Sequence, residues 1–271
     1  MSSSSASRAE AHARSSLAAG LSQSSIVTLP DNPPIRLEQA TCRIGGAVLL
    51  DSVSFEVASA ETVVLLGRSG SGKTTALRLI NLLLTPASGR VLVNGKPTTE
   101  WDAIQLRRSI GYVIQEVGLF PHFTVARNIG LVPELEGRPA AEIRRRTEGV
   151  LEKVGLPLGV LDRYPSQLSG GQRQRVGVAR ALAADPPILL MDEPFGALDP
   201  ITRAEIQREF LGIQRALGKA IVFVTHDVRE ALLLGHRIGV LEAGRLVWWG
   251  TPDEFRSSGD PQIAAFREGL T

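Results

Sequence analysis

The sequence has little of what disulfide-linked or membrane-spanning proteins depend on. Its 271 residues include a single cysteine, Cys42, which can form neither an internal disulfide nor a cysteine metal cluster. One isolated thiol fits a reducing compartment, so we expect a cytoplasmic protein. No run of about 18 apolar residues occurs, and the chain is therefore not expected to span a bilayer by itself. Any role at a membrane would act through a partner protein.

An excess of one charge sign is also missing. The formal net charge is +2, which does not indicate a strongly basic surface, and we expect no nucleic-acid partner. Hydrophobic residues make up 43% of the chain and charged residues 21%. These are ordinary values for a globular protein that buries a real core.

Residues 1–32 lack an apolar cluster. They are rich in Ser and Ala, and this composition predicts a disordered N-terminal extension. A transit peptide is the alternative, which Glu10 and the weak amphipathic pattern do not favour. One folded domain is expected over residues 33–250, beginning with short antiparallel strands. The capping box at Thr251–Glu254 then predicts a short C-terminal helix within residues 251–271.

What the sequence does contain is a strongly patterned glycine-rich segment, Gly67-Arg68-Ser69-Gly70-Ser71-Gly72-Lys73-Thr74. An apolar run precedes it and helical spacing follows it, which predicts a strand, a turn and a helix. Backbone N–H groups beside a helix N-terminus can wrap a phosphate chain. Lys73 can reach the β- and γ-phosphates, and the Thr74 hydroxyl suits Mg²⁺. The segment therefore predicts a nucleotide-phosphate site.

Polar residues follow three further apolar runs. Gln115 follows the run at 110–114, Asp192 and Glu193 follow 188–191, and His226 closely follows 221–224. Ligands of open α/β sheets lie at the carboxyl ends of the strands, so these side chains are placed to meet the nucleotide. Asp192 can hold Mg²⁺, Glu193 can polarise an attacking water, and His226 can hydrogen-bond the γ-phosphate. For Gln115, a capping or loop role remains open.

Between Glu116 and Pro186 the strand pattern gives way to helical spacing, which predicts a helical insert of about residues 116–186. Inside it lies Leu168-Ser169-Gly170-Gly171-Gln172, where Ser169 is expected to cap a helix. Two glycines at a helix start make a second backbone anion site, or a simple glycine turn. The residues alone do not decide between these two interpretations.

The combination resembles the ATP-binding subunit of an ABC transporter over roughly residues 35–250. The resemblance implies an α/β fold with a P-loop NTPase (RecA-like) core, a mostly parallel sheet, an N-terminal antiparallel β subdomain and an inserted helical subdomain. It implies an ATP hydrolase that uses ATP and Mg²⁺, with Lys73, Gln115, Glu193 and His226 in catalysis. The Mg²⁺ contacts that the resemblance implies are Thr74, Gln115 and Asp192. The implied nucleotide contacts are Gly67 to Thr75, Ser169, Gly170, Gly171, Gln172, Asp199 and Ile44.

In this family two subunits form a head-to-tail sandwich. Each ATP is held between the Walker A loop of one subunit, which Gly67–Thr74 resembles, and the signature of the other, which Leu168–Gln172 resembles. The resemblance thus implies a homodimer at the cytoplasmic face of a membrane, bound to a permease through about Gln115–Glu134. That segment is similar to ATPases that drive uptake of glycine betaine, choline and related osmoprotectants, whose cargo a separate binding protein selects. Amino acids, methionine or sulfonates are alternative cargoes. The rival function is a soluble ABC-type ATPase that acts on nucleic acid or ribosomes.

One position departs from the family pattern. Such subunits usually carry an aromatic residue near Ile44 that stacks on adenine, whereas this chain has no aromatic residue before Phe55. Ile44 can still cover the ring with apolar surface. We therefore expect weaker purine discrimination with largely intact phosphate binding.

Overall fold

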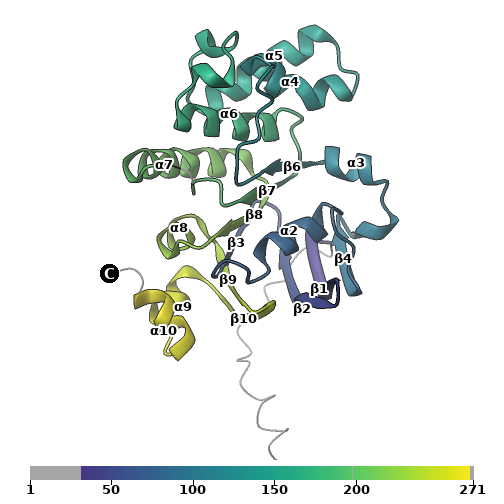
Figure 1. The fold of residues 1–271 in the computed structure, drawn as a ribbon, viewed down its shortest axis with the longest axis vertical. Coiled ribbons are helices and arrows are strands. Elements are labelled where there is room, and N and C mark those ends of the chain that lie inside the picture. The colour runs from purple at the N-terminus through teal and green to yellow at the C-terminus, as the bar shows by residue number, and fades with distance from the viewer. Residues whose placement is uncertain (1–31, 197, 269–271) are drawn as a thin grey trace, which may run out of the picture. The chain divides into compact units, whose positions relative to one another are not determined.

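The computed structural model describes residues 32–196 and 198–268, so the extension predicted over residues 1–32 lies almost wholly outside the described part. The described residues form two β-sheets and a set of helices (Figure 1). None of the described helices is long and apolar enough to cross a membrane.

The N-terminal sheet is antiparallel, with the strand order β2-β1-β4-β5. Its strands are β1 (Ile35–Ile44), β2 (Ala47–Val57), β4 (Ser88–Val93) and β5 (Lys96–Pro97). Gly45 and Gly46 join β1 to β2 with φ values of 56° and 86°. Two consecutive positive φ angles suit a tight hairpin between twisted strands, and glycine adopts them without steric cost. This sheet confirms the predicted antiparallel β subdomain.

The central sheet is mostly parallel, with the strand order β10-β9-β3-β8-β7-β6. Its strands are β3 (Thr62–Leu66), β6 (Ile110–Val113), β7 (Ile188–Asp192), β8 (Ala220–Thr225), β9 (Arg237–Glu242) and β10 (Arg245–Gly250). Only the β9–β10 pair among these neighbours is antiparallel. The carboxyl ends of β3, β8, β7 and β6 consequently share one edge of the sheet, as the sequence predicts.

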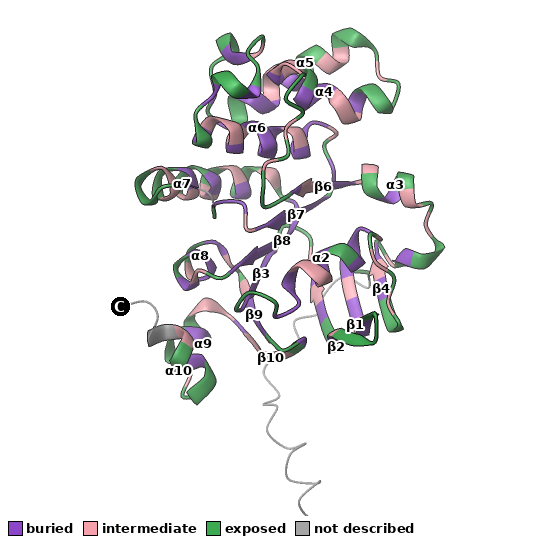
Figure 2. Ribbon diagram, viewed as in Figure 1, coloured by how far each residue is buried: buried purple, intermediate pink, exposed green. Residues whose placement is uncertain are grey.

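The strands β3, β7 and β8 are buried along their whole length (Figure 2). Successive side chains of a strand point to opposite faces of the sheet, so each strand contributes side chains to two hydrophobic cores. Val63 and Leu65 pack with α2 and the N-terminal sheet. Val64 and Leu66 pack toward the helices on the other face. Burial on both faces explains why these strands are continuous apolar runs.

The helices are grouped along the chain. Those before the insert are α2 (Lys73–Ile80), η1 (Thr98–Glu100) and α3 (Ala103–Arg108). The segment between β6 and β7 contains α4 (Val125–Leu135), α5 (Ala140–Lys153), η2 (Leu158–Val160), η3 (Pro165–Gln167) and α6 (Gly170–Leu182), which gather at the top of Figure 1. Their position between two sheet strands confirms the helical insert. The long α7 (Pro200–Leu217) and the short α8 (Val228–Leu234) follow.

The C-terminal segment contains two helices where the sequence predicts one, α9 (Pro252–Ser257) and α10 (Pro261–Glu268). The capping box at Thr251 forms as expected, since its hydroxyl accepts from the Glu254 N–H at 3.2 Å. Pro261 explains the second helix. Its ring cannot continue a preceding helix, but its fixed φ suits the first position of a new one.

Candidate nucleotide site

A cavity of about 1330 Å³ lies at the carboxyl edge of the central sheet, around the loop between β3 and α2. Its lining includes the whole segment Gly67–Thr75 together with Gln115, Glu193 and His226. These residues come from four separate stretches of the chain. The structure therefore brings together most of the residues that the sequence assigns to phosphate binding and hydrolysis.

The phosphate loop depends on its glycines for its backbone path. Gly72 has a φ of 104°, and a Cβ there would lie 2.7 Å from the Leu49 carbonyl oxygen. Any other residue would force the loop away from β2. Gly70, with a φ of 78°, has open space where a Cβ would stand. The loop can thus approach a ligand closely at Gly70 and packs tightly against the protein at Gly72.

Lys73 is the buried cation of this loop. Its ammonium group donates to the carbonyl oxygens of Gly67 at 2.8 Å and Arg68 at 2.9 Å. Burial lowers the pKa of Lys73, while the nearby carboxylates of Glu193 and Asp192 oppose this shift. An ammonium group has three donors, so a third remains beside these two hydrogen bonds for a phosphate oxygen.

Thr74 and Asp192 form the second part of the site. The Thr74 hydroxyl donates to Oδ1 of Asp192 at 2.9 Å, and the Tyr112 hydroxyl donates to Oδ2 at 3.3 Å. Burial raises the pKa of Asp192, and these two hydrogen bonds act in the opposite direction. Burial is also the main cause of the raised pKa of Tyr112. Tyr112 is not identifiable as a site residue from the sequence, because a tyrosine inside a strand pattern indicates packing.

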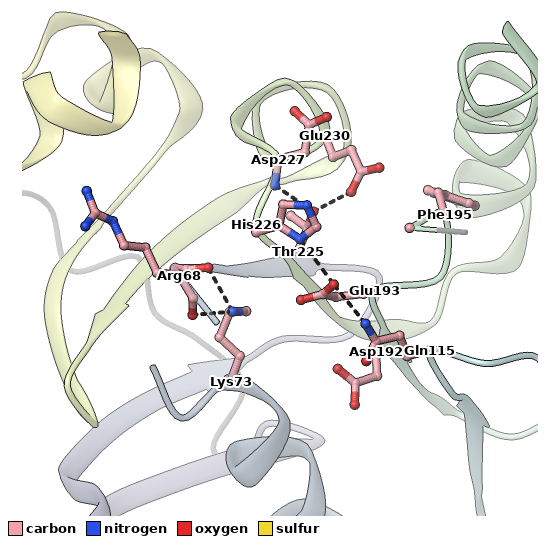
Figure 3. Close-up of polar contacts among 12 residues, drawn as sticks. Arg68, Lys73, Gln115, Asp192, Glu193, Phe195, Thr225, His226, Asp227 and Glu230 are labelled. Carbon is pink, nitrogen blue, oxygen red and sulfur yellow. Dashed lines mark hydrogen bonds and ion pairs between the residues drawn. The ribbon is translucent and has the colours of Figure 1, made fainter. Parts of the chain in front are cut away.

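Glu193 stands at the centre of the third part (Figure 3). Its Oε2 lies 3.3 Å from Nε2 of Gln115 and 3.1 Å from Nδ1 of His226. The Glu193 backbone has a φ of 42°. A positive φ is uncommon for a residue other than glycine, and residues with such backbone angles are often found at functional sites. Gln115 therefore contacts the proposed catalytic base rather than the Thr74–Asp192 pair.

The second candidate anion site, at Ser169 to Gln172, lies elsewhere on the chain. The Ser169 hydroxyl accepts from the Gln172 N–H at 3.2 Å, and the Gln172 side chain accepts from the Ser169 N–H at 3.0 Å. This capping box leaves Ser169 and Gly170 exposed at the start of α6. Asp199 is exposed as well and caps α7 by accepting from the Thr202 N–H, which lowers its pKa. None of the described residues that line the cavity comes from 169–172 or is Asp199.

The apolar part of the cavity differs from the expectation. Ile44 is half exposed at the end of β1 and is not among the described lining residues, whereas Leu49 is. Gln262 and Phe266 of α10 also line the cavity. No local pattern could have revealed them, since they lie almost 200 residues beyond the phosphate loop. Ile44 as an adenine contact therefore stays a prediction, and Leu49 and Phe266 are apolar lining residues that the sequence did not indicate.

The donor groups fit a phosphate chain and a hard cation. Ser71 lines the cavity, and its buried Oγ has no hydrogen-bond partner among the described residues. The Thr74 hydroxyl and the Asp192 carboxylate are oxygen donors of the kind that Mg²⁺ prefers. Within residues 32–196 and 198–268 there is no cluster of three His, Cys, Asp or Glu side chains that could hold a metal ion. A nucleotide-bound Mg²⁺ does not require one, because phosphates and waters supply most of its ligands.

Comparisons with known proteins identify a family and several relatives of this chain. The family described as ABC transporter matches residues 50–196. The chain is 51% identical over 221 residues to the glycine betaine/carnitine/choline transport ATP-binding protein OpuCA of Bacillus subtilis, covering 81% of this chain and 58% of that protein. It is 53% identical over 206 residues to the osmoprotectant import ATP-binding protein OsmV of Salmonella typhimurium, covering 76% and 54%. The chain therefore spans little more than half the length of these relatives.

The fold also matches a solved structure. The dimeric, ADP- and phosphate-bound post-hydrolysis state of the ATP-binding cassette MJ0796 superposes with a TM-score of 0.72. The two chains are 34% identical, and the match covers 80% of this chain and 98% of that one.

Proposed function

The chain belongs to the ABC transporter family as an ATP-binding protein, and from this premise we propose that it hydrolyses ATP to drive solute import through a partner permease. The observation that carries the proposal is the Glu193 carboxylate, which contacts Gln115 and His226 beside the phosphate loop. A carboxylate held in this way can accept a proton from a water that attacks the γ-phosphate.

Each part of the site has a task in this reaction. The backbone of the phosphate loop and the third donor of Lys73 hold the phosphates. Thr74 and Asp192 would hold Mg²⁺, which when bound neutralises charge on the β- and γ-phosphates. His226 orients Glu193 and is placed to donate to the γ-phosphate. Gln115 meets the same carboxylate oxygen and so links the reaction centre to the helical segment that follows it.

The separation of the two anion sites supports a head-to-tail dimer. Ser169 and Gly170 are exposed at the start of α6 and contribute nothing to the described lining of their own chain's cavity. A second copy can bring its exposed helix N-terminus to the phosphates, where backbone N–H groups and the helix dipole favour an anion. ATP would then be enclosed between the two copies. The MJ0796 cassette, whose fold this chain shares, is likewise dimeric.

The segment after Gln115 has the properties of a docking surface for a permease. Phe120 is 46% exposed and contacts Phe123 with ring centroids 5.1 Å apart. The fully buried Asn128 accepts from the Phe120 N–H and donates to the carbonyl oxygens of Phe120 and Phe123. These hydrogen bonds fix the backbone that carries the two aromatic residues, which lowers the entropy cost of binding a partner. We assign Gln115–Glu134 as the permease contact, at the cytoplasmic face of a membrane.

The cargo that the relatives favour is glycine betaine, choline or a related quaternary amine. Radiolabelled uptake should be measured in cells that lack this subunit and are complemented with wild type or with Glu193→Gln. Betaine or choline uptake restored by wild type alone is expected. Restored transport of an amino acid, methionine or a sulfonate, with betaine and choline unaffected, would overturn the cargo assignment. Copurification of ribosomes or DNA, with no permease, would overturn the transport function.

A further inference from the structure

Glu230 is a buried carboxyl group that the hydrolysis mechanism described above does not use. It lies on α8, four residues after His226, and its residue surface is 4% exposed. The Thr225 hydroxyl is 2.5 Å from its Oε2, and the Gln207 side-chain amide donates to its Oε1 at 2.8 Å. Burying a carboxyl group is costly unless its oxygens are hydrogen-bonded, and here both are.

We propose that Glu230 is a positioning residue for hydrolysis, which joins α7 to the loop that carries His226. The proposal rests on the ATPase function proposed above. Thr225 directly precedes His226, and its Oγ1 also accepts from the Asp227 N–H at 2.9 Å. The Thr225 hydroxyl therefore links the residue before His226 to the residue after it, which restricts the backbone at His226. Glu230 holds that hydroxyl in place (Figure 3).

Helix α7, which contacts Glu230 through Gln207, also contacts the loop that follows Glu193. Gln207, which holds Glu230, lies one turn after Arg203 on α7. The Arg203 guanidinium donates to the carbonyl oxygens of Phe195 at 3.2 Å and Leu198 at 2.9 Å. Both carbonyls belong to the loop between Glu193 and Asp199. One helix thus holds both the segment after Glu193 and the segment around His226.

Side-chain packing also holds the loop after Glu193 against α7 and β8. Phe195 is fully buried and lies against Phe210 of α7 and Phe223 of β8, with ring centroids 6.0 Å and 5.6 Å away. The contact between Glu193 Oε2 and His226 Nδ1 joins the two segments at 3.1 Å. Because the exposed Asp199 caps the start of α7, a movement of Asp199 at a dimer interface would shift α7 and, through Arg203 and Gln207, both partners of this contact.

The chemistry of Glu230 shows which substitution should be tolerated. Burial raises its pKa, while the hydrogen bonds from Thr225 and Gln207 oppose the shift. An ionised carboxylate accepts a hydrogen bond from Thr225, and a neutral carboxyl group can donate one instead. Glutamine keeps this geometry, because its amide can donate to Thr225 while its oxygen accepts from Gln207. Alanine removes both hydrogen bonds.

The test compares four full-length variants with wild type in steady-state ATP hydrolysis, nucleotide binding and thermal unfolding. They are Glu230→Gln, Glu230→Ala, Gln207→Ala and Gln214→Ala. Gln214 is the matched control, because it is also buried on α7 but donates to Thr62 and the Leu234 carbonyl, away from Glu193 and His226. Loss of Glu230 is expected to lower kcat about 10- to 100-fold with KM and nucleotide affinity nearly unchanged, as small misplacement of reacting groups does.

The remaining variants separate positioning from general stability. Glu230→Gln should restore kcat to within about threefold of wild type, and Gln207→Ala should lower it less than Glu230→Ala does. Gln214→Ala should lower the unfolding temperature without lowering kcat. If Glu230→Ala does not fold, Gln207→Ala tests the same connection. Wild-type kcat in both Glu230→Ala and Gln207→Ala, or equal losses in Glu230→Ala and Glu230→Gln, would overturn the proposal. An inactive wild type would instead contradict the ATPase function.

Discussion

The Thr74 hydroxyl donates to Oδ1 of Asp192 at 2.9 Å, although the two residues are 118 positions apart in the chain. Thr74 lies in the first turn of α2, the helix after the phosphate loop, and Asp192 ends β7. The β8 strand lies between β3 and β7 in the sheet, so the pair spans three adjacent strands. Two oxygen donors from opposite halves of the chain thus meet where a nucleotide-bound cation would sit.

Removing the hydroxyl of this pair should weaken the use of Mg²⁺. Thr74→Val keeps the shape of the side chain but cannot act as a ligand. The Mg²⁺ concentration for half-maximal ATPase activity is expected to rise about tenfold or more. Tyr112→Phe is the control, since it removes only a 3.3 Å hydrogen bond to the other oxygen of Asp192, which is worth about 1 kcal/mol. An unchanged Mg²⁺ requirement in Thr74→Val would contradict the metal assignment.

Replacing Glu193 with Gln should trap an ATP-bound dimer. The amide cannot accept the proton of the attacking water, so ATP remains bound between the two copies. Size-exclusion chromatography with Mg-ATP should show a dimer for Glu193→Gln and a monomer without nucleotide. Lys73→Ala is the comparison, because it should weaken ATP binding and abolish hydrolysis without forming the dimer. A strict monomer of Glu193→Gln at high protein concentration would count against the sandwich.

The apolar lining of the cavity allows a test of adenine recognition. Stacking of a base on an aromatic side chain is worth about 1 to 3 kcal/mol. Ile44→Tyr should therefore tighten ATP binding by about 1 kcal/mol, or roughly fivefold. Leu49→Ala, which trims a residue that lines the cavity, should weaken it. Calorimetry checks both. If Ile44→Tyr has no effect while Leu49→Ala weakens binding, the adenine lies beside Leu49 and away from Ile44.

The ion pair between Lys219 and Asp185 should make stability depend on pH. Lys219 donates to Oδ1 of Asp185 at 2.7 Å, and this hydrogen bond lowers the pKa of Asp185 in the folded state. A carboxyl group with a lowered folded pKa stabilises the protein above its unfolded pKa of about 3.9 and loses that contribution as pH falls through the folded value. Because Asp185 is 73% exposed, solvent screens the pair, and we expect about 0 to 1 kcal/mol at neutral pH.

Asp185→Asn is a suitable variant, since asparagine also tolerates the positive φ of 56° at this position. Denaturant unfolding should show a deficit for the variant at pH 7 that shrinks toward pH 3 and in high salt. A deficit of the same size at both pH values would show that the ionised carboxylate does not contribute.

Much of the architecture follows from local sequence. The phosphate loop between an apolar strand and a helix, the helix cap at Ser169, the capping box at Thr251, and the buried strands β7 and β8 all form where the pattern predicts them. Hydrogen bonds within one turn and the burial of consecutive side chains involve neighbours in the chain. Their energetics can therefore be inferred from a short stretch of residues.

Other features depend on the tertiary structure alone. Tyr112 reaches Asp192 because β6 pairs in register with β7, and Leu49 and Phe266 reach the cavity from distant elements. The separation of Ser169 from the phosphate loop likewise depends on where the helical insert packs. Strand order and packing bring together residues that are dozens to hundreds of positions apart, and residue periodicity reports only whether a side chain is buried, not which neighbour it meets.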